Sequence, residues 1–263
     1  MYSVNELLKT LEEYAPLTLS AEMIKVGAYD NSGLLIKTHD EVKKVLFSVD
    51  LSESVIARAK RLGADTVITH HPAIYTPIKS VDEQGENRVV ALAIKSNLNV
   101  ISMHLNLDIC DKGIDFSLAT KLGAKSYRII NLITAQNGYG REFSVGTGVG
   151  FSAFTAKIKK DFGSKKVLSY GSKNAKVSVV ASFCGAGSSD AVEYIRAGGK
   201  ADTIVTSDCA HHHIKEILEN GKKLVIIPHY VAEEVGFNAF YEWTKERLPK
   251  NLSAEYFVEK IYK

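Results

Sequence analysis

The chain has 263 residues, of which 45% are hydrophobic and 24% are charged. This composition is typical of a soluble globular protein and excludes disorder and collagen-like repeats, and the length is enough for one large domain or two lobes. A formal net charge of +3 is too small to indicate a nucleic-acid or membrane-surface partner. The start of the chain has no apolar signal segment, and no apolar run reaches the roughly 18 residues of a membrane helix, so we expect a cytoplasmic protein.

The first half of the chain predicts a helix and then alternating strands and helices. Ser3 and Glu6 form a capping box ahead of leucines spaced for one helical face, and Pro16 ends this helix. Strands are expected at 45–49, 66–69 and 100–103, with helices between them at 52–62 and 88–96. Alternation of this kind is typical of parallel pairing in an α/β layer architecture.

The same order of elements returns in the second half. Strands are expected at 177–181, 203–206 and 224–227, and helices at 188–197 and 210–218. The segment GADTVIT at 63–69 matches KADTIVT at 200–206, and both copies end a strand at a threonine that polar residues follow. These matches on corresponding elements indicate an internal duplication.

Between the halves, residues 138–150 are rich in glycine and residues 157–176 are rich in lysine. Apolar residues continue through this stretch, so it predicts a junction between two lobes rather than a flexible linker. A solvated helix face explains the lysines at least as well as phosphate binding does. We therefore predict two similar α/β lobes of parallel or mixed sheet with flanking helices, at 1–129 and 130–263.

Histidines carry the main chemical signal of the sequence. Ligands of parallel α/β sheets bind at the carboxyl ends of strands, and all histidines except His39 follow such expected ends. His70 and His71 come directly after one strand, and Pro72 favours an extended backbone that turns the two rings apart. The pair can then serve two metal ions, although two hydrogen-bonded histidines that shape a loop are an alternative.

Two further segments combine a histidine with an acid four residues later. His104 and Asp108 follow a strand in the first half, and His229 and Glu233 follow one in the second. Residues four apart share one helical face, so each pair can converge on one point. A structural ion pair at a helix end explains each pair equally well on its own.

Together these segments provide three imidazoles and two carboxylates. Such a set suits two borderline cations such as Zn, Fe, Mn, Co or Ni, and it predicts that the duplicated βαβαβ units face a shared metal cleft. His104 is a further ligand or a residue that orients one. The predicted ligands are His70, His71, Asp108, His229 and Glu233.

Other chemistries have weaker support. His211, His212 and His213 lie on an expected helix and point in different directions, so we expect His212 to line the cavity rather than to bind metal. Cys184 precedes a glycine turn, where a small buried residue is the simpler explanation. The three cysteines form no Cys-x-x-Cys pair, which excludes a thiolate zinc site. Phosphate-loop, dinucleotide-binding and nucleophile-elbow motifs are missing from the sequence.

The chain resembles the YbgI-like dinuclear metal proteins, the GTP cyclohydrolase 1 type 2 homologue family, over nearly its whole length. It matches the short form of this family, which lacks the domain that longer members insert between their lobes. It departs from the family pattern at Leu105, Ser207 and Pro228, none of which is a ligand, although Leu105 and Ser207 bear on the expected cavity wall. The resemblance is carried by DNSGL at 30–34, THHP at 69–72, HLNLD at 104–108, GYGR at 138–141, GAG at 185–187, TSD at 206–208 and HYxxE at 229–233.

The resemblance implies a ring-shaped homohexamer of two-lobed subunits with a two-metal centre on the same five ligands. It also implies hydrolysis of a guanine nucleotide, with ring opening and release of formate. On that interpretation Glu233 bridges the metals and His104 or His212 transfers protons. The sequence shows no guanine-reading motif, so a hydrolase acting on another heterocycle or a phosphoester fits as well. The competing hypothesis is a non-enzymatic ring that handles metal or binds protein or nucleic-acid partners.

Overall fold

The computed structural model describes residues 2–260, so the last three residues of the predicted C-terminal lobe lie outside the described range. The chain forms two compact units, one from residues 2–110 and 237–259, the other from residues 111–236 with Lys260. The predicted boundary at 129/130 therefore differs from the observed division. Residues 237–259 return to the first unit because the last strand pairs with a strand of that unit.

The first unit is built on a five-stranded mixed sheet with the order β1-β4-β3-β2-β11. The pairs β2–β3, β3–β4 and β11–β2 are parallel, and β1 pairs antiparallel with β4. Its strands are β1 (Gly33–Ile36), β2 (Lys44–Ser48), β3 (Thr66–Thr69), β4 (Asn99–Ser102) and β11 (Ser253–Tyr256). Its helices are α1 (Val4–Glu12), α2 (Leu17–Lys25), α3 (Glu53–Leu62), α4 (Arg88–Lys95) and α5 (Leu105–Ile109).

Local sequence signals set the ends of these helices. The capping box predicted at Ser3 and Glu6 is present, and α1 ends before Pro16. Ser52 caps α3 by accepting a hydrogen bond from the Val55 amide, and Gly63 ends this helix in the left-handed region at φ +66°. The predicted helices at 52–62 and 88–96 are confirmed to within one residue.

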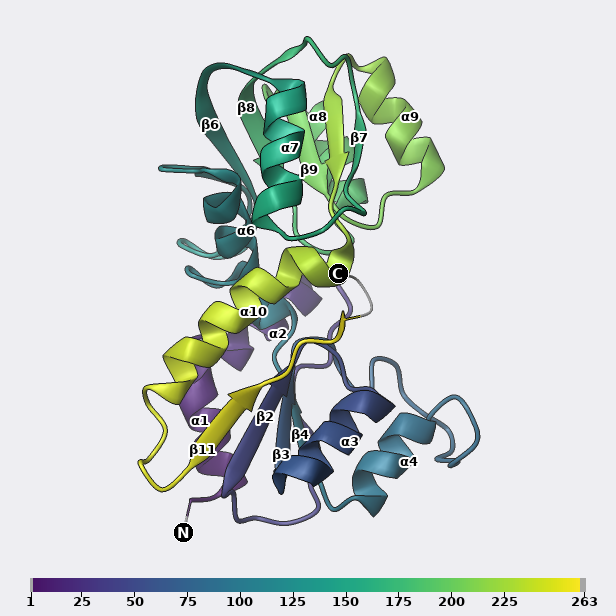
Figure 1. The fold of residues 1–263 in the computed structure, drawn as a ribbon, viewed down its shortest axis with the longest axis vertical. Helices are drawn as coiled ribbons and strands as arrows, with labels where there is room; N and C mark the ends of the chain where they lie inside the picture. Colours follow the sequence, from purple (N-terminus) through teal and green to yellow (C-terminus); the bar gives the residue numbers. More distant parts are fainter. Residues whose placement is uncertain (1, 261–263) are drawn as a thin grey trace. The chain divides into compact units, whose positions relative to one another are not determined.

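Both faces of this sheet are covered, as a parallel core requires. Leu46 and Val67 belong to a core cluster with residues of α3 and α4, and both helices lie on the same face of the sheet in Figure 1. Phe47 points to the opposite face, because neighbouring residues of a strand alternate. There its ring lies 6.0 Å from Phe237 and 6.1 Å from Phe240, on helix α10 (His229–Lys245).

The second unit contains a six-stranded mixed sheet with the order β5-β6-β8-β9-β10-β7. The pairs β8–β9 and β9–β10 are parallel, while β5, β6 and β7 pair antiparallel with their neighbours. Its strands are β5 (Arg128–Leu132), β6 (Gly138–Gly150), β7 (Leu168–Tyr170), β8 (Lys176–Ser182), β9 (Thr203–Thr206) and β10 (Lys223–Ile226). Its helices are α6 (Ile114–Leu122), α7 (Phe151–Asp161), α8 (Ser188–Arg196) and α9 (His211–Glu219). Figure 1 shows α7 on one face of this sheet and α8 and α9 on the other.

The predicted junction at 138–150 is wrong, because this glycine-rich segment is the long strand β6 inside the second sheet. Glycine is needed there for close packing rather than for flexibility. A Cβ atom on Gly140 would lie 2.6 Å from the ring of Phe183, and one on Gly138 would lie 2.2 Å from the carbonyl oxygen of Asn131. The lysines that follow, Lys157, Lys159 and Lys160, are exposed on α7.

The repeated Ala-Asp-Thr segment makes the same hydrogen bonds in both units. The Asp65 carboxylate accepts from the amides of Lys43 and Lys44 at 2.9 and 3.1 Å. The Asp202 carboxylate accepts from the amides of two residues of β8 at 2.8 and 3.0 Å. Each aspartate also accepts from the hydroxyl of the threonine that follows it. The two parallel cores thus share local contacts as well as strand order, as an internal duplication predicts.

Across residues 2–260, none of the helices combines the length and the apolar character needed to cross a bilayer.

Candidate metal centre

The first unit gathers three histidines at the carboxyl ends of β3 and β4. His70 is fully buried, and the amides of His70 and His71 both donate to the carbonyl of Val49 at 3.0 Å. His104 precedes α5, two residues after β4 ends. The ring centroids of His70 lie 4.8 Å from His71 and 5.2 Å from His104. One ring nitrogen from each of the three histidines lies within 4.8 Å of the others, close enough to serve a metal site.

Each of these rings is held through its Nδ1 atom. His70 Nδ1 lies 2.8 Å from the carbonyl oxygen of Met103, and His71 Nδ1 lies 2.6 Å from Asp50. His104 Nδ1 lies 2.7 Å from Asp30. Because a carbonyl or carboxylate oxygen can only accept, Nδ1 carries the proton in each ring. Each Nε2 atom is then the basic nitrogen, which is the tautomer of a metal-binding histidine whose other nitrogen is oriented by an acceptor.

Asp30 is part of a buried polar network. Its carboxylate accepts from the hydroxyls of Ser20 and Ser32 as well as from His104. Burial alone would raise the pKa of Asp30, but the hydrogen bonds from His104 and Ser32 outweigh it and the pKa is lowered. Asp30 therefore remains ionised at neutral pH and favours a proton on Nδ1 of His104.

Asp108 approaches His70 rather than the histidine four residues before it. Its Oδ1 atom lies 3.5 Å from Nε2 of His70, whereas His104 is turned toward Asp30. The reason is that His104 lies outside the first turn of α5 and has a non-helical backbone. The expected convergence of His104 and Asp108 on one helical face is therefore wrong, although both follow β4.

In the second unit, His229 and Glu233 do converge. Both lie in α10, and His229 Nε2 is 2.9 Å from Glu233 Oε1. Nδ1 of His229 is held 2.5 Å from Asp208, a residue with an unusual positive φ of 29°. This repeats the arrangement of Asp50 with His71. The carboxylate of Glu233 is nearly completely buried, at 3% exposure.

The two His-x-x-x-acid segments are not in register. The amide of Met103 donates to Thr69 and the amide of Ile227 donates to Thr206, so these two positions correspond. His104 then corresponds to Pro228, and His229 comes one residue later in its repeat. This offset explains why His229 lies inside its helix while His104 lies before α5.

His212 is exposed on the first turn of α9, with its ring centroid 4.2 Å from that of His213. The ring of His213 is held in place by the hydroxyl of Ser188, which lies 2.9 Å from its Nδ1 atom. The roles predicted for His104 and His212 in proton transfer remain predictions. Of the two, only His104 adjoins the histidine cluster of the first unit.

An exposed aromatic pair adjoins His104. Tyr29 and Tyr75 are 47% and 49% exposed, and their ring centroids are 5.1 Å apart. The ring of Tyr75 stands perpendicular to His104 at 6.1 Å. Asn31 donates a hydrogen bond to the carbonyl of Ile74 at 2.6 Å, which ties together the two loops that carry the tyrosines. The pair offers an aromatic surface beside the histidines.

Three aspartates that orient histidines were not predicted as site residues. Asp30 and Asp208 lie within the DNSGL and TSD motifs, so their motifs were the available signal. Asp50 is the second residue after β2, as His71 is the second residue after β3, and this position after a parallel strand was the only hint.

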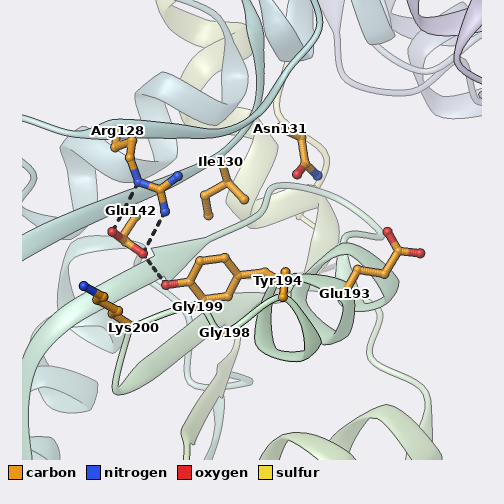
Figure 2. A pocket seen from close by; sticks show the side chains of 10 residues that line it. Arg128, Ile130, Asn131, Glu142, Glu193, Tyr194, Gly198, Gly199 and Lys200 are labelled. Atoms are coloured by element: carbon orange, nitrogen blue, oxygen red, sulfur yellow. Dashed lines mark hydrogen bonds and ion pairs between the residues drawn. The ribbon is translucent and has the colours of Figure 1, made fainter.

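The second unit also contains a cavity of about 550 Å³ between β5, β6 and the end of α8. Figure 2 shows Glu142 between the Arg128 guanidinium, at 3.1 Å, and the hydroxyl of Tyr194. Burial and this hydrogen bond to Glu142 raise the pKa of Tyr194 to about 12. None of the predicted metal ligands lines this cavity. Its lining residues are Arg128, Ile130, Asn131, Glu142, Glu193, Tyr194, Ala197, Gly198, Gly199 and Lys200.

Known proteins resemble this chain over its full length. A protein of Clostridium perfringens named GTP cyclohydrolase 1 type 2 homolog is 27% identical over 98% of this chain and 96% of its own. A protein of the same name from Methanocaldococcus jannaschii is 29% identical over 95% of this chain and 96% of its own.

Solved structures share the fold. A Staphylococcus aureus hypothetical protein superposes with a TM-score of 0.83 at 26% identity, covering 98% of this chain and 96% of that one. Reduced HcgD from Methanocaldococcus jannaschii has a TM-score of 0.78 at 26% identity, covering 97% of both chains. Protein ybgI, described as of unknown function, has a TM-score of 0.82 at 23% identity, covering 99% of this chain and 100% of its own. The family model Duf34/NIF3 (NGG1p interacting factor 3) matches residues 2–263, and the chain therefore belongs to this family.

Proposed function

We propose that this protein binds two divalent metal ions and uses them for hydrolysis. The proposed ligands divide between the units, with His70, His71 and Asp108 in the first and His229 and Glu233 in the second. Imidazole nitrogens and carboxylate oxygens without a thiolate suit Zn, Fe, Mn, Co or Ni. When bound, such a pair of ions lowers the pKa of a coordinated water and polarises the group under attack.

The observation that carries this proposal is the state of the histidine rings. His70, His71 and His229 each have Nδ1 held by an acceptor, at 2.8, 2.6 and 2.5 Å. Histidines that only filled space or shaped loops would have no reason to be held at the same ring nitrogen. Histidine ligands commonly have this arrangement, because the acceptor fixes the ring and strengthens Nε2 as a donor to the metal.

His104 is suited to move a proton in this reaction. Its Nδ1 donates to the buried, ionised Asp30, and its ring lies beside those of His70 and His71. A carboxylate that holds one nitrogen of a histidine stabilises the protonated ring, so Nε2 can accept a proton and return it. His104 would thus act at Nε2 as general base and acid.

For the substrate we propose a nucleotide or a related heterocycle. The exposed Tyr29 and Tyr75 rings beside His104 offer a surface on which a planar base can stack. The names of the curated relatives point the same way. By the same resemblance we propose that the chain assembles as a homo-oligomer, a hexameric ring.

Metal content per chain tests the proposal directly. We expect plasma mass spectrometry of untagged protein to find about two first-row metal ions per chain. His71→Ala and Glu233→Gln should each lose metal, because each removes a ligand. His211→Ala is the matched control, since it removes an exposed imidazole on α9 outside the proposed set and should keep both ions.

A wild-type protein that stays metal-free after incubation with Zn, Mn and Fe would overturn the proposal. Metal that survives in both ligand variants would refute the ligand assignment. Two ions per chain without turnover of nucleotides, phosphodiesters or cyclic amides would instead favour the metal-handling alternative. We expect His104→Gln to retain both metal ions and to lose hydrolytic turnover.

A further inference from the structure

The turn between β8 and α8 lies against the second-unit ligands. Gly185 in this turn has a positive φ of 57°, and a Cβ atom placed on it would lie 2.6 Å from Glu233 Oε1 and 3.4 Å from His229 Nε2. The turn therefore lies close to both side chains and leaves no room for a Cβ atom beside Glu233. Any shift of this turn must move the Glu233 carboxylate or the His229 ring.

Cys184, the residue before Gly185, is held on both sides of its backbone. Its amide donates to Asp115 Oδ1 at 3.3 Å, and its carbonyl accepts from the hydroxyl of Tyr139. Asp115 comes from α6 and Tyr139 from β6, so two separate elements fix the turn. Cys184 is itself buried, at 1% exposure.

Asp115 is in turn fixed by Arg141. The Arg141 guanidinium donates from Nη1 to Asp115 Oδ2 at 2.9 Å and to the carbonyl of Gly138 at 2.8 Å. It also lies over the ring of Tyr127 at 5.2 Å. Arg141 and Asp115 are both fully buried.

The buried ion pair between Arg141 and Asp115 has a high desolvation cost, so it stabilises the core poorly. Nε and Nη2 of Arg141 are buried without an acceptor, and each such donor lowers the stability of the folded state. Buried ion pairs are often no more stable than apolar residues of similar size. Stability of the fold alone therefore does not account for an arginine here, whereas fixing a turn in one position does.

We propose that Arg141, Asp115 and Tyr139 are positioning residues that hold the Gly185 turn against Glu233 and His229. The turn then keeps the Glu233 carboxylate and the His229 ring in the geometry that binds metal. This inference rests on the proposed metal site, and it adds a second layer of residues that act on the proposed ligands through the turn.

The sharpest test compares two glycines in the same backbone region. Gly185→Ala adds a methyl group against Glu233, whereas Gly163→Ala adds one at φ +61° with no atom within 4 Å. Both variants carry the same backbone strain, so only the contact differs. Tyr139→Phe removes the hydroxyl that holds Cys184 and keeps the ring. Its control is Tyr2→Phe, which removes a hydroxyl that donates to the carbonyl of Glu6 on α1.

Three measurements are made on each variant. The dissociation constants for Zn²⁺ and Co²⁺ come from chelator competition, and the Co²⁺ absorption spectrum reports ligand geometry. Long-range ¹H–¹⁵N spectra of the metal-free protein report the tautomer and ring environment of His229. For Gly185→Ala and Tyr139→Phe we expect roughly 10–100-fold weaker binding, an altered Co²⁺ spectrum and shifted His229 resonances. Gly163→Ala and Tyr2→Phe should match the wild type.

Unchanged affinity, Co²⁺ spectrum and His229 resonances in Gly185→Ala and Tyr139→Phe would overturn the inference. If Gly185→Ala fails to fold, Tyr139→Phe decides by the same measurements. A wild type that binds neither ion defeats the proposed function instead, and the His229 resonances of the metal-free variants then still decide whether the turn positions this ring.

Discussion

At the scale of single residues, the fixed orientation of the imidazole rings is the observation that most favours metal binding. His71 and His229 lie in different units, yet each presents Nδ1 to an aspartate that follows a strand, Asp50 and Asp208. The acceptors are far from the histidines in the chain, 21 residues in both cases. The histidines are visible in the sequence. Their pairing with these aspartates becomes visible only when the strands are placed side by side in the sheet.

Asp50→Ala should weaken metal binding without removing a ligand. Its carboxylate fixes the His71 ring, and the loss of such an acceptor typically costs roughly 10–100-fold in metal affinity. Chelator competition with Zn²⁺ measures this change. Asp40→Ala is the matched control, because Asp40 is an exposed carboxylate paired with Lys37. Equal affinities of the two variants would contradict an orienting role for Asp50.

At the scale of elements, the two parallel cores follow the sequence closely. The strands predicted at 66–69 and 203–206 coincide with β3 and β9, because continuous β-branched runs end at threonines there. The aspartates before them, Asp65 and Asp202, each bind two backbone amides of the neighbouring strand. These contacts fix the register at the start of each parallel pair.

The Asp202 carboxylate is expected to contribute to the free energy of unfolding in a way that depends on pH. Burial alone would raise its pKa, but hydrogen bonds from Thr203, the Val179 and Ser178 amides and Lys223 outweigh it and the pKa is lowered. A lowered folded-state pKa stabilises the protein above the unfolded value of about 3.9, and this stabilisation is lost as the pH falls through the folded value.

Asp202→Asn should therefore lower the free energy of unfolding by about 1–2 kcal/mol at pH 7, a modest figure because the carboxylate is partly exposed. The difference from wild type should shrink below about pH 4. Urea unfolding at pH 7, 5 and 3 measures both effects. Asp40→Asn should differ little from wild type throughout, and a deficit for Asp202→Asn that persists at pH 3 would refute the electrostatic explanation.

The strands added to the two parallel cores were the part of the fold that could not be predicted. Strand β6 contains Gly138 and Gly140, which we predicted to lie in a junction between two lobes. In the structure they make room for Asn131 and Phe183. Strand β11 adds to the first sheet by pairing with β2, a contact that local patterns do not carry. Likewise, the candidate ligands were visible as residue types at strand ends, whereas their orienting acceptors and the Gly185 turn depend on tertiary packing.

At the scale of the whole molecule, the chain passes from the first unit to the second and back again. The proposed ligands come from both units. A ligand that binds only the folded state stabilises it, by about 2.7 kcal/mol at a hundredfold excess over its dissociation constant. Bound metal should therefore raise the free energy of unfolding of the protein.

Removing metal should lower the melting temperature by roughly 5–10 °C for a chain of this size. Calorimetry of protein stripped with a chelator and then reloaded with Zn²⁺ measures the shift and its reversal. His71→Ala should melt at one temperature with or without Zn²⁺, while His211→Ala should behave as wild type. Identical melting of stripped and loaded wild type would contradict metal binding to the folded state.

At Asp208, the residue that the proposed site needs differs from the residue that would best stabilise the fold. Its φ of +29° lies where a side chain costs roughly 1 kcal/mol relative to glycine. Glycine would relax the backbone and at the same time release the His229 ring. Optimising this position for thermal stability would therefore remove the acceptor that fixes the His229 ring, so a stabilised version of the protein would bind metal less well at the proposed centre.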